Sequence, residues 1–178
     1  MTETIFIKEI GRVKKVRKEL EKALNIKINI THNGIEILDE GGATEYIAIK
    51  ILEAVGMGFS VKSALKLQNE DYLFEIMSIK KHSRPSRLAT IKGRLIGKKG
   101  KALETLSELT GCDLKIQDYE VGMIGKSTDI TFAINALVSL IHGSPHSNVY
   151  SYLEKSKHLR EIREDEQESL AKGQGDIE

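Results

Sequence analysis

Residues 96–106 contain residue types at a spacing that could bind an anionic ligand. They read Ile-Gly-Lys-Lys-Gly-Lys-Ala-Leu-Glu-Thr-Leu. Gly97 and Gly100 bracket Lys98 and Lys99, and apolar residues at helical spacing follow. A turn built on glycines lets a phosphate backbone approach closely, because no Cβ is in the way. A helix that starts at such a turn also favours an anion through its N–H groups and its dipole. The pattern therefore predicts a contact site for the sugar–phosphate chain of a nucleic acid.

The sequence on both sides of this turn is strongly basic. No Asp or Glu lies between Ile76 and Leu103, where the basic residues are Lys80, Lys81, Arg84, Arg87, Lys92, Arg94, Lys98, Lys99 and Lys101. The whole chain has 27 Lys and Arg against 26 Asp and Glu, so its net charge is only +1 and the basic run is a local patch. The residues predicted to bind nucleic acid here are Gly97, Lys98, Lys99 and Gly100 at the backbone, with Arg87, Arg94 and Lys101 extending the electrostatic track.

Composition indicates a globular protein of a reducing compartment. Hydrophobic residues are 40% of the 178 residues, which suffices for a buried core, and the single cysteine allows no intrachain disulfide. The N-terminus shows no signal pattern, and no apolar run approaches the roughly 18 residues of a membrane span. We therefore expect a soluble, cytoplasmic protein without a membrane partner. Aromatic residues are only 5%, which argues against a large base-stacking platform.

Hydrophobic periodicity predicts one order of elements twice. The first half gives a strand, a helix, two strands joined by an Asn-Gly hairpin signal and a helix, in residues 4–7, 10–24, 26–30, 35–38 and 44–56. The second half gives that order with two helices around the glycine turn, in residues 72–76, 86–96, 101–109, 113–117, 120–124 and 127–142. Further helices are predicted over 59–69 and near 148–153. Because two strands in each half form a hairpin, the fold class is α+β: a three-stranded antiparallel sheet in each half, with helices on one face.

The second half resembles the KH domain of the type found in eukaryotes and archaea, type I. The resemblance covers residues 72–142 and rests on the glycine turn, the apolar period of Leu103 and Leu106 and the order of the strands. KH domains hold about four single-stranded nucleotides at this turn, and the groove beside it is usually lined by apolar side chains. The resemblance implies that Leu114 and Ile116 help to form such a groove for bases.

Three further segments resemble a narrower family, the archaeal relatives of the eukaryotic pre-ribosomal KH proteins (the KRR-type proteins and the partner of the Nob endonuclease). They are Gly41-Gly42-Ala43-Thr44, residues 56–61 and the run His-Gly-Ser-Pro-His-Ser-Asn-Val-Tyr over 142–150. The resemblance implies assembly or processing of the small ribosomal subunit, through single-stranded rRNA near the 3′ end of the 16S rRNA. The protein partners it suggests are a Nob-type endonuclease and the α subunit of the archaeal initiation factor that carries initiator tRNA.

The resemblance divides the chain into two tandem KH-like (type I) units, of which the first departs from the pattern. Gly11-Arg12-Val13-Lys14 stands where a Gly-x-x-Gly turn is expected, and without the second glycine the backbone has no ready sharp turn. Residues 1–58 are therefore expected to be a degenerate KH-like domain with a structural or protein-binding role, although its lysines could touch phosphates. The other expected parts are a linking helix over 59–71, a KH domain over 72–153 and an acidic, partly disordered tail over 154–178.

Nucleotide hydrolysis is an alternative that residues 122–128 suggest, since they read Gly-Met-Ile-Gly-Lys-Ser-Thr. A P-loop needs a further glycine at the position of Glu120, and a carboxylate there would repel phosphates. The simpler interpretation is that Gly125 ends a hairpin and that Ser127 or Thr128 caps the next helix.

Catalysis and metal binding have no residues to support them in this sequence. His142 and His146 are separated by helix-breaking Gly143 and Pro145, and one cysteine is too few for a typical zinc set. Cys112, at the start of a predicted strand, is expected to be a buried structural thiol. We expect no enzyme activity, no catalytic residue, no metal and no cofactor. The remaining alternative is a protein-interaction scaffold in translation or ribosome assembly, with incidental RNA binding.

Overall fold

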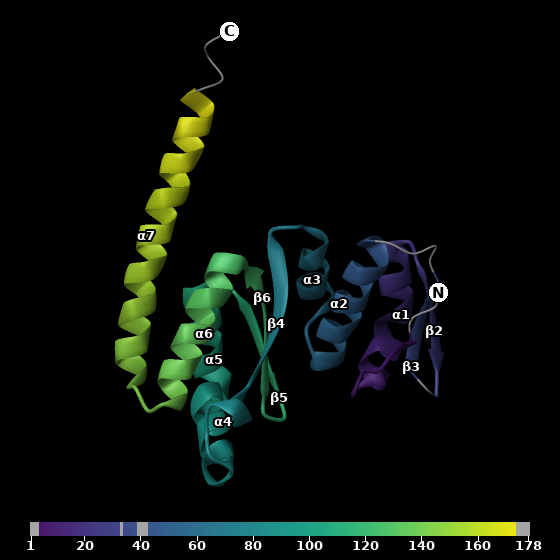
Figure 1. Cartoon of the computed structure of the whole chain (residues 1–178), viewed down its shortest axis with the longest axis horizontal. Helices are drawn as coiled ribbons and strands as arrows, with labels where there is room; N and C mark the ends of the chain where they lie inside the picture. Colours follow the sequence, from purple (N-terminus) through teal and green to yellow (C-terminus); the bar gives the residue numbers. More distant parts are fainter. Residues whose placement is uncertain (1–3, 33, 39–42, 174–178) are drawn as a thin grey trace.

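The computed structural model describes residues 4–32, 34–38 and 43–173, which form two α+β units side by side (Figure 1). The predictions that concern Asn33 and residues 41–42 lie outside this description. Within the described ranges, no helix has both the length and the apolar character that a membrane span requires.

The first unit is a three-stranded antiparallel sheet with two helices on one face. Its elements are β1 (Thr4–Ile5), α1 (Ile10–Leu24), β2 (Lys27–Thr31), β3 (Gly34–Leu38) and α2 (Ala43–Met57). The strand order is β1-β3-β2, so β3 pairs with both other strands. The helix predicted over residues 10–24 is confirmed. It ends at Asn25, whose left-handed backbone, with φ of 53°, reverses the chain into β2.

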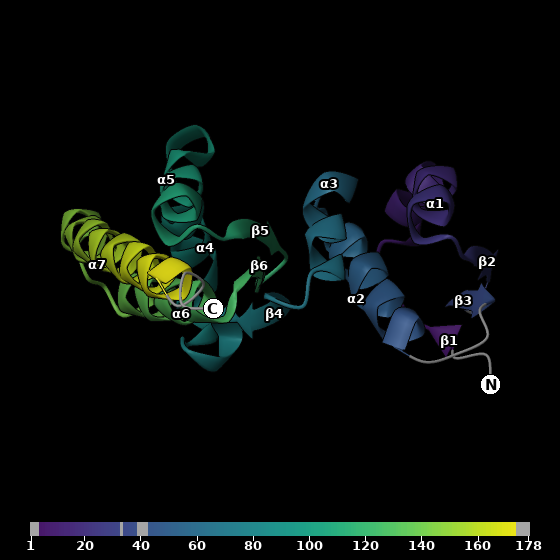
Figure 2. The same cartoon turned by 90° about the horizontal axis from the view of Figure 1, so that it is seen from above.

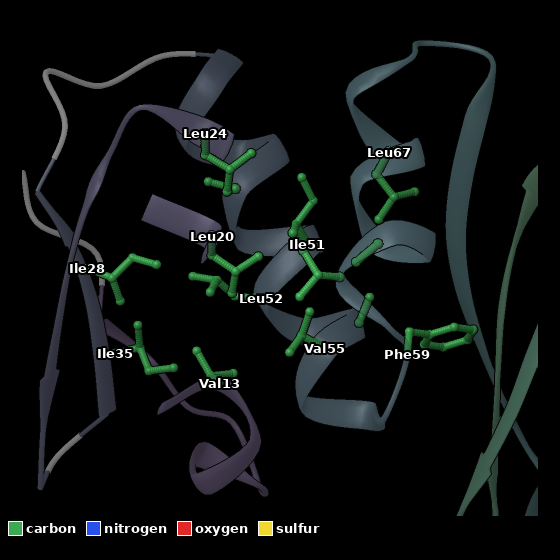
Figure 3. Packing of buried hydrophobic residues seen from close by; sticks show 14 of the residues in the cluster. Val13, Leu20, Leu24, Ile28, Ile35, Ile51, Leu52, Val55, Phe59 and Leu67 are labelled. Atoms are coloured by element: carbon green, nitrogen blue, oxygen red, sulfur yellow. The ribbon is translucent and has the colours of Figure 1, made fainter. Parts of the chain in front are cut away.

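Apolar side chains of the first sheet and its helices meet in one core (Figure 3). Ile28 and Ile35 come from the sheet, Leu20 from α1 and Leu52 from α2, and each is at most 1% exposed. Burying a side chain of this size stabilises the fold by about 1.5–3 kcal/mol. The alternate apolar residues of the strand predicted over 26–30 therefore face this core, which explains the alternation.

A short helix and a 3-10 turn connect the units, where the sequence predicts one longer helix. They are α3 (Val61–Ala64) and η1 (Leu65–Gln68). The helix starts only after Ser60, whose backbone is extended and whose hydroxyl accepts a hydrogen bond from the N–H of Ser63 at 3.1 Å. The α-helix is shorter than its apolar pattern predicts, because it begins only after this cap and becomes a 3-10 turn at Leu65.

The second unit repeats the strand order and has two helices in its first connection. Its elements are β4 (Tyr72–Ser78), α4 (Leu88–Ile96), α5 (Lys101–Thr110), β5 (Asp113–Gln117), β6 (Glu120–Lys126) and α6 (Ser127–Ile141), with 3-10 turns η2 (Ile79–Lys81), η3 (Pro85–Arg87) and η4 (Lys98–Gly100). The strand order is β4-β6-β5, with β6 central. Leu95, Leu106, Met123 and Leu137 belong to the core between this sheet and its helices.

The two units share a packed boundary, because α2 and α3 cover the face of the second sheet opposite its own helices (Figures 1 and 2). The rings of Phe59 and Phe74 meet edge to face across it, with centroids 6.0 Å apart. Ile124 of β6 belongs to the core of the first unit. Burial on both faces of β6 explains its continuous run of buried residues from 121 to 125.

Helix α7 (His146–Gly173) is far longer than the sequence predicts, because it continues through most of the segment that was expected to be a tail. Its first half packs on α5 and α6. Arg160 then donates to the carbonyl oxygens of Leu109 at 3.3 Å and of Thr110 at 3.2 Å, and it pairs with Asp129. These contacts satisfy the last carbonyls of α5 and fix α7 on the second unit.

Candidate nucleic-acid interface

The glycine turn joins α4 to α5 and departs from helical geometry at three residues. The φ angle is 72° at Gly97, 55° at Lys99 and 80° at Gly100. Glycine adopts such positive angles freely, whereas a lysine rarely does. The chain therefore stops α4 at Ile96 and starts α5 at Lys101, with the residues between them forming a tight, separate turn.

The two glycines of the turn are required for different reasons. A Cβ on Gly97 would lie 2.5 Å from the Cβ and 2.8 Å from the backbone nitrogen of Ala102, so the start of α5 packs directly on Gly97. A Cβ on Gly100 would meet no atom within 4 Å. Gly97 therefore allows the turn to close. Gly100 presents bare backbone to open space, where a phosphate chain can come near.

The cations of the turn are available to a ligand. Lys98, Lys99 and Lys101 are exposed, and no carboxylate within the described ranges forms an ion pair with any of them. Arg87 at the end of η3 is exposed as well. No side chain caps α5 at its N-terminus, so the positive end of the helix dipole faces the turn. Together these groups form a surface that attracts phosphate.

Arg94 lies differently from the other predicted cations. Its guanidinium Nη2 donates to the carbonyl oxygen of Ser144, and its Nε is buried. The Arg94 carbonyl in turn lies 3.1 Å from Nε2 of His146. The structure thus places Arg94 as a link between α4 and the start of α7, with its charge turned toward the protein.

The apolar side of the site is β5, and chain geometry brings its end back to the level of the glycine turn. Helix α5 rises about 15 Å over its 10 residues, and β5 rises about 16 Å over its 5 residues. The two elements pack on each other and are joined only by Gly111 and Cys112, so β5 returns alongside the helix. Ile116 near the end of β5 therefore lies on the return path toward the start of α5, where the glycine turn is.

The two predicted groove residues of β5 have unequal exposure. Leu114 is only 6% exposed and belongs to the core, so its side chain is not open to a ligand. Ile116 is half-buried and reaches the surface. β5 is also an edge strand, and the backbone N–H and C=O groups on its outer side have no strand partner in the described sheet. Such groups can pair with the edges of unstacked bases.

An aromatic ring with two lysines extends this surface, and sequence analysis missed it. Tyr119 lies in the turn after β5, with Lys80 Nζ 5.6 Å and Lys92 Nζ 5.7 Å from its ring centroid. The basic run contains both lysines, but nothing in the local sequence indicates that a tyrosine beyond the next helix and strand lies between them. The three residues bring positive charge to the end of the sheet nearest the groove.

The described residues of the first unit contain no such turn between β1 and β2. Helix α1 is continuous from Ile10, and Gly11 lies in its first turn, where a Cβ would meet nothing within 4 Å. Lys14 and Lys15 are exposed on this helix. The unit thus has cations without a break in the helix at which a backbone could approach.

The residues that suggested a P-loop form ordinary strand and helix. Gly125 lies within β6 and pairs with Leu73, because β4 and β6 pair along their whole length. The helix cap is Lys126, with no side-chain hydrogen bond to the helix. The predictions that Gly125 ends the hairpin and that Ser127 or Thr128 caps α6 are therefore wrong. In the part of the chain that the structure describes, no group of His, Cys, Asp and Glu side chains is arranged to hold a metal ion.

Cys112 is a structural thiol, as predicted. It is 1% exposed in the core of the second unit. Burial, followed by the negative charge of Asp129, raises the pKa of Cys112 to about 12. The thiol therefore stays protonated near neutral pH and is a poor nucleophile.

Comparison with known proteins agrees with this geometry. Residues 73–158 match the eukaryotic-type KH domain (KH-domain type I), in the form of the second KH domain of Pno1. The KH domain-containing protein MJ0443 of Methanocaldococcus jannaschii is 30% identical over 83% of this chain and 68% of its own length. The pre-rRNA-processing protein pno1 of Aspergillus fumigatus is also 30% identical, over 74% of this chain, which spans only 56% of that relative.

Solved structures extend the similarity to nearly the whole chain. Dim2p from Pyrococcus horikoshii is 30% identical and covers 87% of this chain and 99% of its own, with a TM-score of 0.76. A chain of the a/eIF2α–aDim2p–rRNA complex from the same organism is 31% identical, with a TM-score of 0.77, over 89% of this chain and 94% of that one. Since 87% or more of this chain is covered, the similarity extends beyond the second unit into the first. The chain belongs to the family of KH-domain proteins that includes MJ0443 and Dim2p.

Proposed function

We propose that this protein binds single-stranded RNA at the glycine turn of its second unit. The observation that carries the proposal is Gly100, whose backbone has positive φ, faces open space and stands among unpaired lysines. Lys98 and Lys99 bind phosphates, and Lys101 and Arg87 extend the charged track. Ile116 and the outer edge of β5 receive the bases. Leu114 supports this wall from the core, and Arg94 holds α4 in place.

The RNA that we propose is ribosomal, and the process is maturation of the small subunit. Support comes from the names of the relatives: the Aspergillus protein is a pre-rRNA-processing protein, and the Pyrococcus complex contains rRNA and eIF2α. We further propose that the strand bound by this chain lies near the 3′ end of the 16S rRNA. The α subunit of the initiation factor that carries initiator tRNA is a proposed protein partner, and so is a Nob-type endonuclease. The chain itself acts as a binding protein rather than an enzyme.

Two tandem KH-like units are part of this proposal. The matching strand orders, β1-β3-β2 and β4-β6-β5, support a common ancestry of the units. Residues 1–58 then form a KH-like domain without the RNA turn, 59–71 a connection, 72–153 the RNA-binding KH domain and 154–178 a charged C-terminal extension that is helical through residue 173. The first unit contributes mainly by packing, through α2 and α3, on the sheet of the second.

Crosslinking in cells, followed by sequencing of the bound RNA, tests the proposed function. We expect reads to accumulate at the 3′ end of the small-subunit rRNA for the natural chain and to disappear for Gly100→Asp. Asp tolerates the left-handed region better than most residues, and its side chain meets open space, so this variant keeps its fold. Reads scattered over mRNA would contradict the ribosomal assignment. Protein partners that are retained after nuclease treatment and with Lys98→Glu/Lys99→Glu, while RNA reads are absent, would favour the scaffold instead.

A further inference from the structure

A pocket of about 430 Å³ lies where the two units meet, and the proposed function gives it no role. Its wall combines the start of α1, the end of α2, the residues before α3 and the end of β5. Apolar lining comes from Val16, Met57, Phe59 and Ile116 among others, and the charged residues in the lining are Arg12, Lys15 and Lys115. Among the described residues, no acidic side chain lines it. The described lining thus combines an apolar interior with basic side chains.

The pocket adjoins the proposed RNA groove at Ile116. That residue belongs to the proposed apolar wall on the helix side of β5, and it also lines the pocket. Its neighbour Lys115 points to the opposite face of the sheet, where Gly122 packs on Phe59. Figure 1 shows the turn after β5, the end of α2 and the start of α1 on the lower side of the molecule, where α4 also lies. Because β5 is an edge strand, an RNA strand that leaves the groove and passes around the end of β5 reaches the pocket.

The three cations of the pocket differ in their freedom. Arg12 donates from Nη1 to the carbonyl oxygen of Gly56 at 3.1 Å, which holds its guanidinium over the end of α2. Lys15 and Lys115 are exposed, and no carboxylate in the described ranges forms an ion pair with either. Arg12 is thus a fixed charge, while the two lysines can follow a phosphate.

We propose that this pocket binds a nucleotide of the same RNA strand, next to those held at the glycine turn. The apolar wall takes the face of an unstacked base, and Lys15, Lys115 and Arg12 neutralise the flanking phosphates. The inference rests on the proposed function and deepens it. It gives the first unit a direct part in RNA binding through the side of α1, without a glycine turn of its own.

Affinity measured against RNA length tests the proposal. The probes are oligouridylates of four and twelve nucleotides, since a KH groove holds about four. We expect Lys15→Glu/Lys115→Glu to lower the affinity for the twelve-mer by about tenfold or more and to leave the four-mer within about twofold. The slope of log affinity against log salt for the twelve-mer should become shallower by about 1.4, because two phosphate contacts are lost. The neutral Lys15→Gln/Lys115→Gln variant should give a smaller loss of the same kind.

Two controls separate this inference from the proposed function. Lys18→Glu/Lys155→Glu makes the same charge change at exposed lysines outside the pocket and should bind both probes like the natural chain. Gly100→Asp should lose both probes, and normal binding by that variant would overturn the function at the turn itself. If Gly100→Asp loses both probes while Lys15→Glu/Lys115→Glu binds the twelve-mer normally, only the pocket proposal fails. Equal losses for both probes would also overturn it, because the lysines would then act only through a diffuse field.

Discussion

The two units of this protein share one sheet order and differ in the segment that follows the first strand. In the first unit this segment is a single helix of 15 residues, α1. In the second, α4 and α5 are separated by the glycine turn. Both arrangements cover a three-stranded sheet and bury a continuous core. The comparison teaches that a three-stranded sheet can be covered without the turn, so we attribute the positive φ of Lys99 to the proposed ligand binding.

Glycine content alone does not make the difference, because α1 also contains a glycine. Gly11 keeps helical geometry, and nothing lies near the place of its missing Cβ. Gly97 and Gly100 instead stand at positive φ with only two residues between them. Two features therefore distinguish the candidate RNA site from a plain helix. They are the second glycine, Gly100, and the close packing of Ala102 on Gly97.

The largest predicted effect tests whether the units are separate folding bodies. Phe59→Ala should destabilise the protein by about 3–5 kcal/mol, because it empties a site that is 5% exposed between the units. Cys112 is the only cysteine and lies in the second core, so its labelling during denaturant titration reports on that unit alone. We expect circular dichroism to show an early transition before the thiol becomes reactive. If circular dichroism and thiol labelling instead report one transition at the midpoint of the natural chain, the boundary between the units contributes little to stability.

The same substitution should have opposite effects in the two units. Gly97→Ala places a Cβ 2.5 Å from that of Ala102 at a positive φ, and we expect a loss of about 1–3 kcal/mol in thermal or chemical unfolding. Gly11→Ala in the helical first turn of α1 should stabilise by up to about 0.5–1 kcal/mol. Equal effects at both sites would remove the distinction between a strained turn and an ordinary helix.

Charge reversal should separate the two basic surfaces. Lys98→Glu/Lys99→Glu should weaken single-stranded RNA binding by more than tenfold and reduce the salt slope by about 1.4, since about two phosphate contacts are lost. Lys18→Glu/Lys22→Glu on α1 is the matched change and should alter affinity by less than about threefold. Fluorescence anisotropy with a labelled oligouridylate at several salt concentrations measures both quantities. A similar loss of RNA affinity for the two variants would contradict an RNA site limited to the glycine turn and the pocket between the units.

The dependence of stability on pH also distinguishes the units, since only the second contains a cysteine. Burial raises the pKa of Cys112 from 9.0 to about 12. Between these values the unfolded chain has lost the thiol proton and the folded chain keeps it, so stability falls as pH rises from about 9 toward 12. The loss should be about 1 kcal/mol between pH 9 and pH 10.

Cys112→Ala is the control for this pH dependence. It should show a shallower decline in the free energy of unfolding over the same range. Identical pH profiles for the variant and the natural chain would show that the thiol titrates alike in the folded and unfolded states.

Local sequence patterns predicted the helices and strands whose bounds are set by neighbouring residues. Helix α1 and strand β5 have the predicted bounds, because apolar period and chain reversal set them. The turn geometry followed from the two glycines. The partner of Arg94, the pairing of Gly125 within β6 and the rings and lysines around Tyr119 could not be predicted, since each depends on residues distant in sequence. The pocket at Lys115 was missed for the same reason.

The C-terminal segment is a helix where its sequence predicts none. Its charge pattern predicts a solvated tail, yet the helix continues to Gly173. The anchor is Arg160, which pairs with Asp129 and caps the end of α5 from a distance of about 50 residues. A charged residue with a structural partner of that kind looks, in sequence, like any other exposed charge.

The most direct test of the central claim is the affinity of three proteins for a four-nucleotide single-stranded RNA, measured by calorimetry. They are the natural chain and the variants Gly100→Asp and Gly11→Asp. Each variant introduces one carboxylate at a glycine that has open space around it, Gly100 in the second unit and Gly11 in the first. Loss of binding by Gly100→Asp alone, with both variants folded, is the predicted result. Normal binding by Gly100→Asp, or equal loss by Gly11→Asp, would contradict the claim that the glycine turn of the second unit holds the RNA.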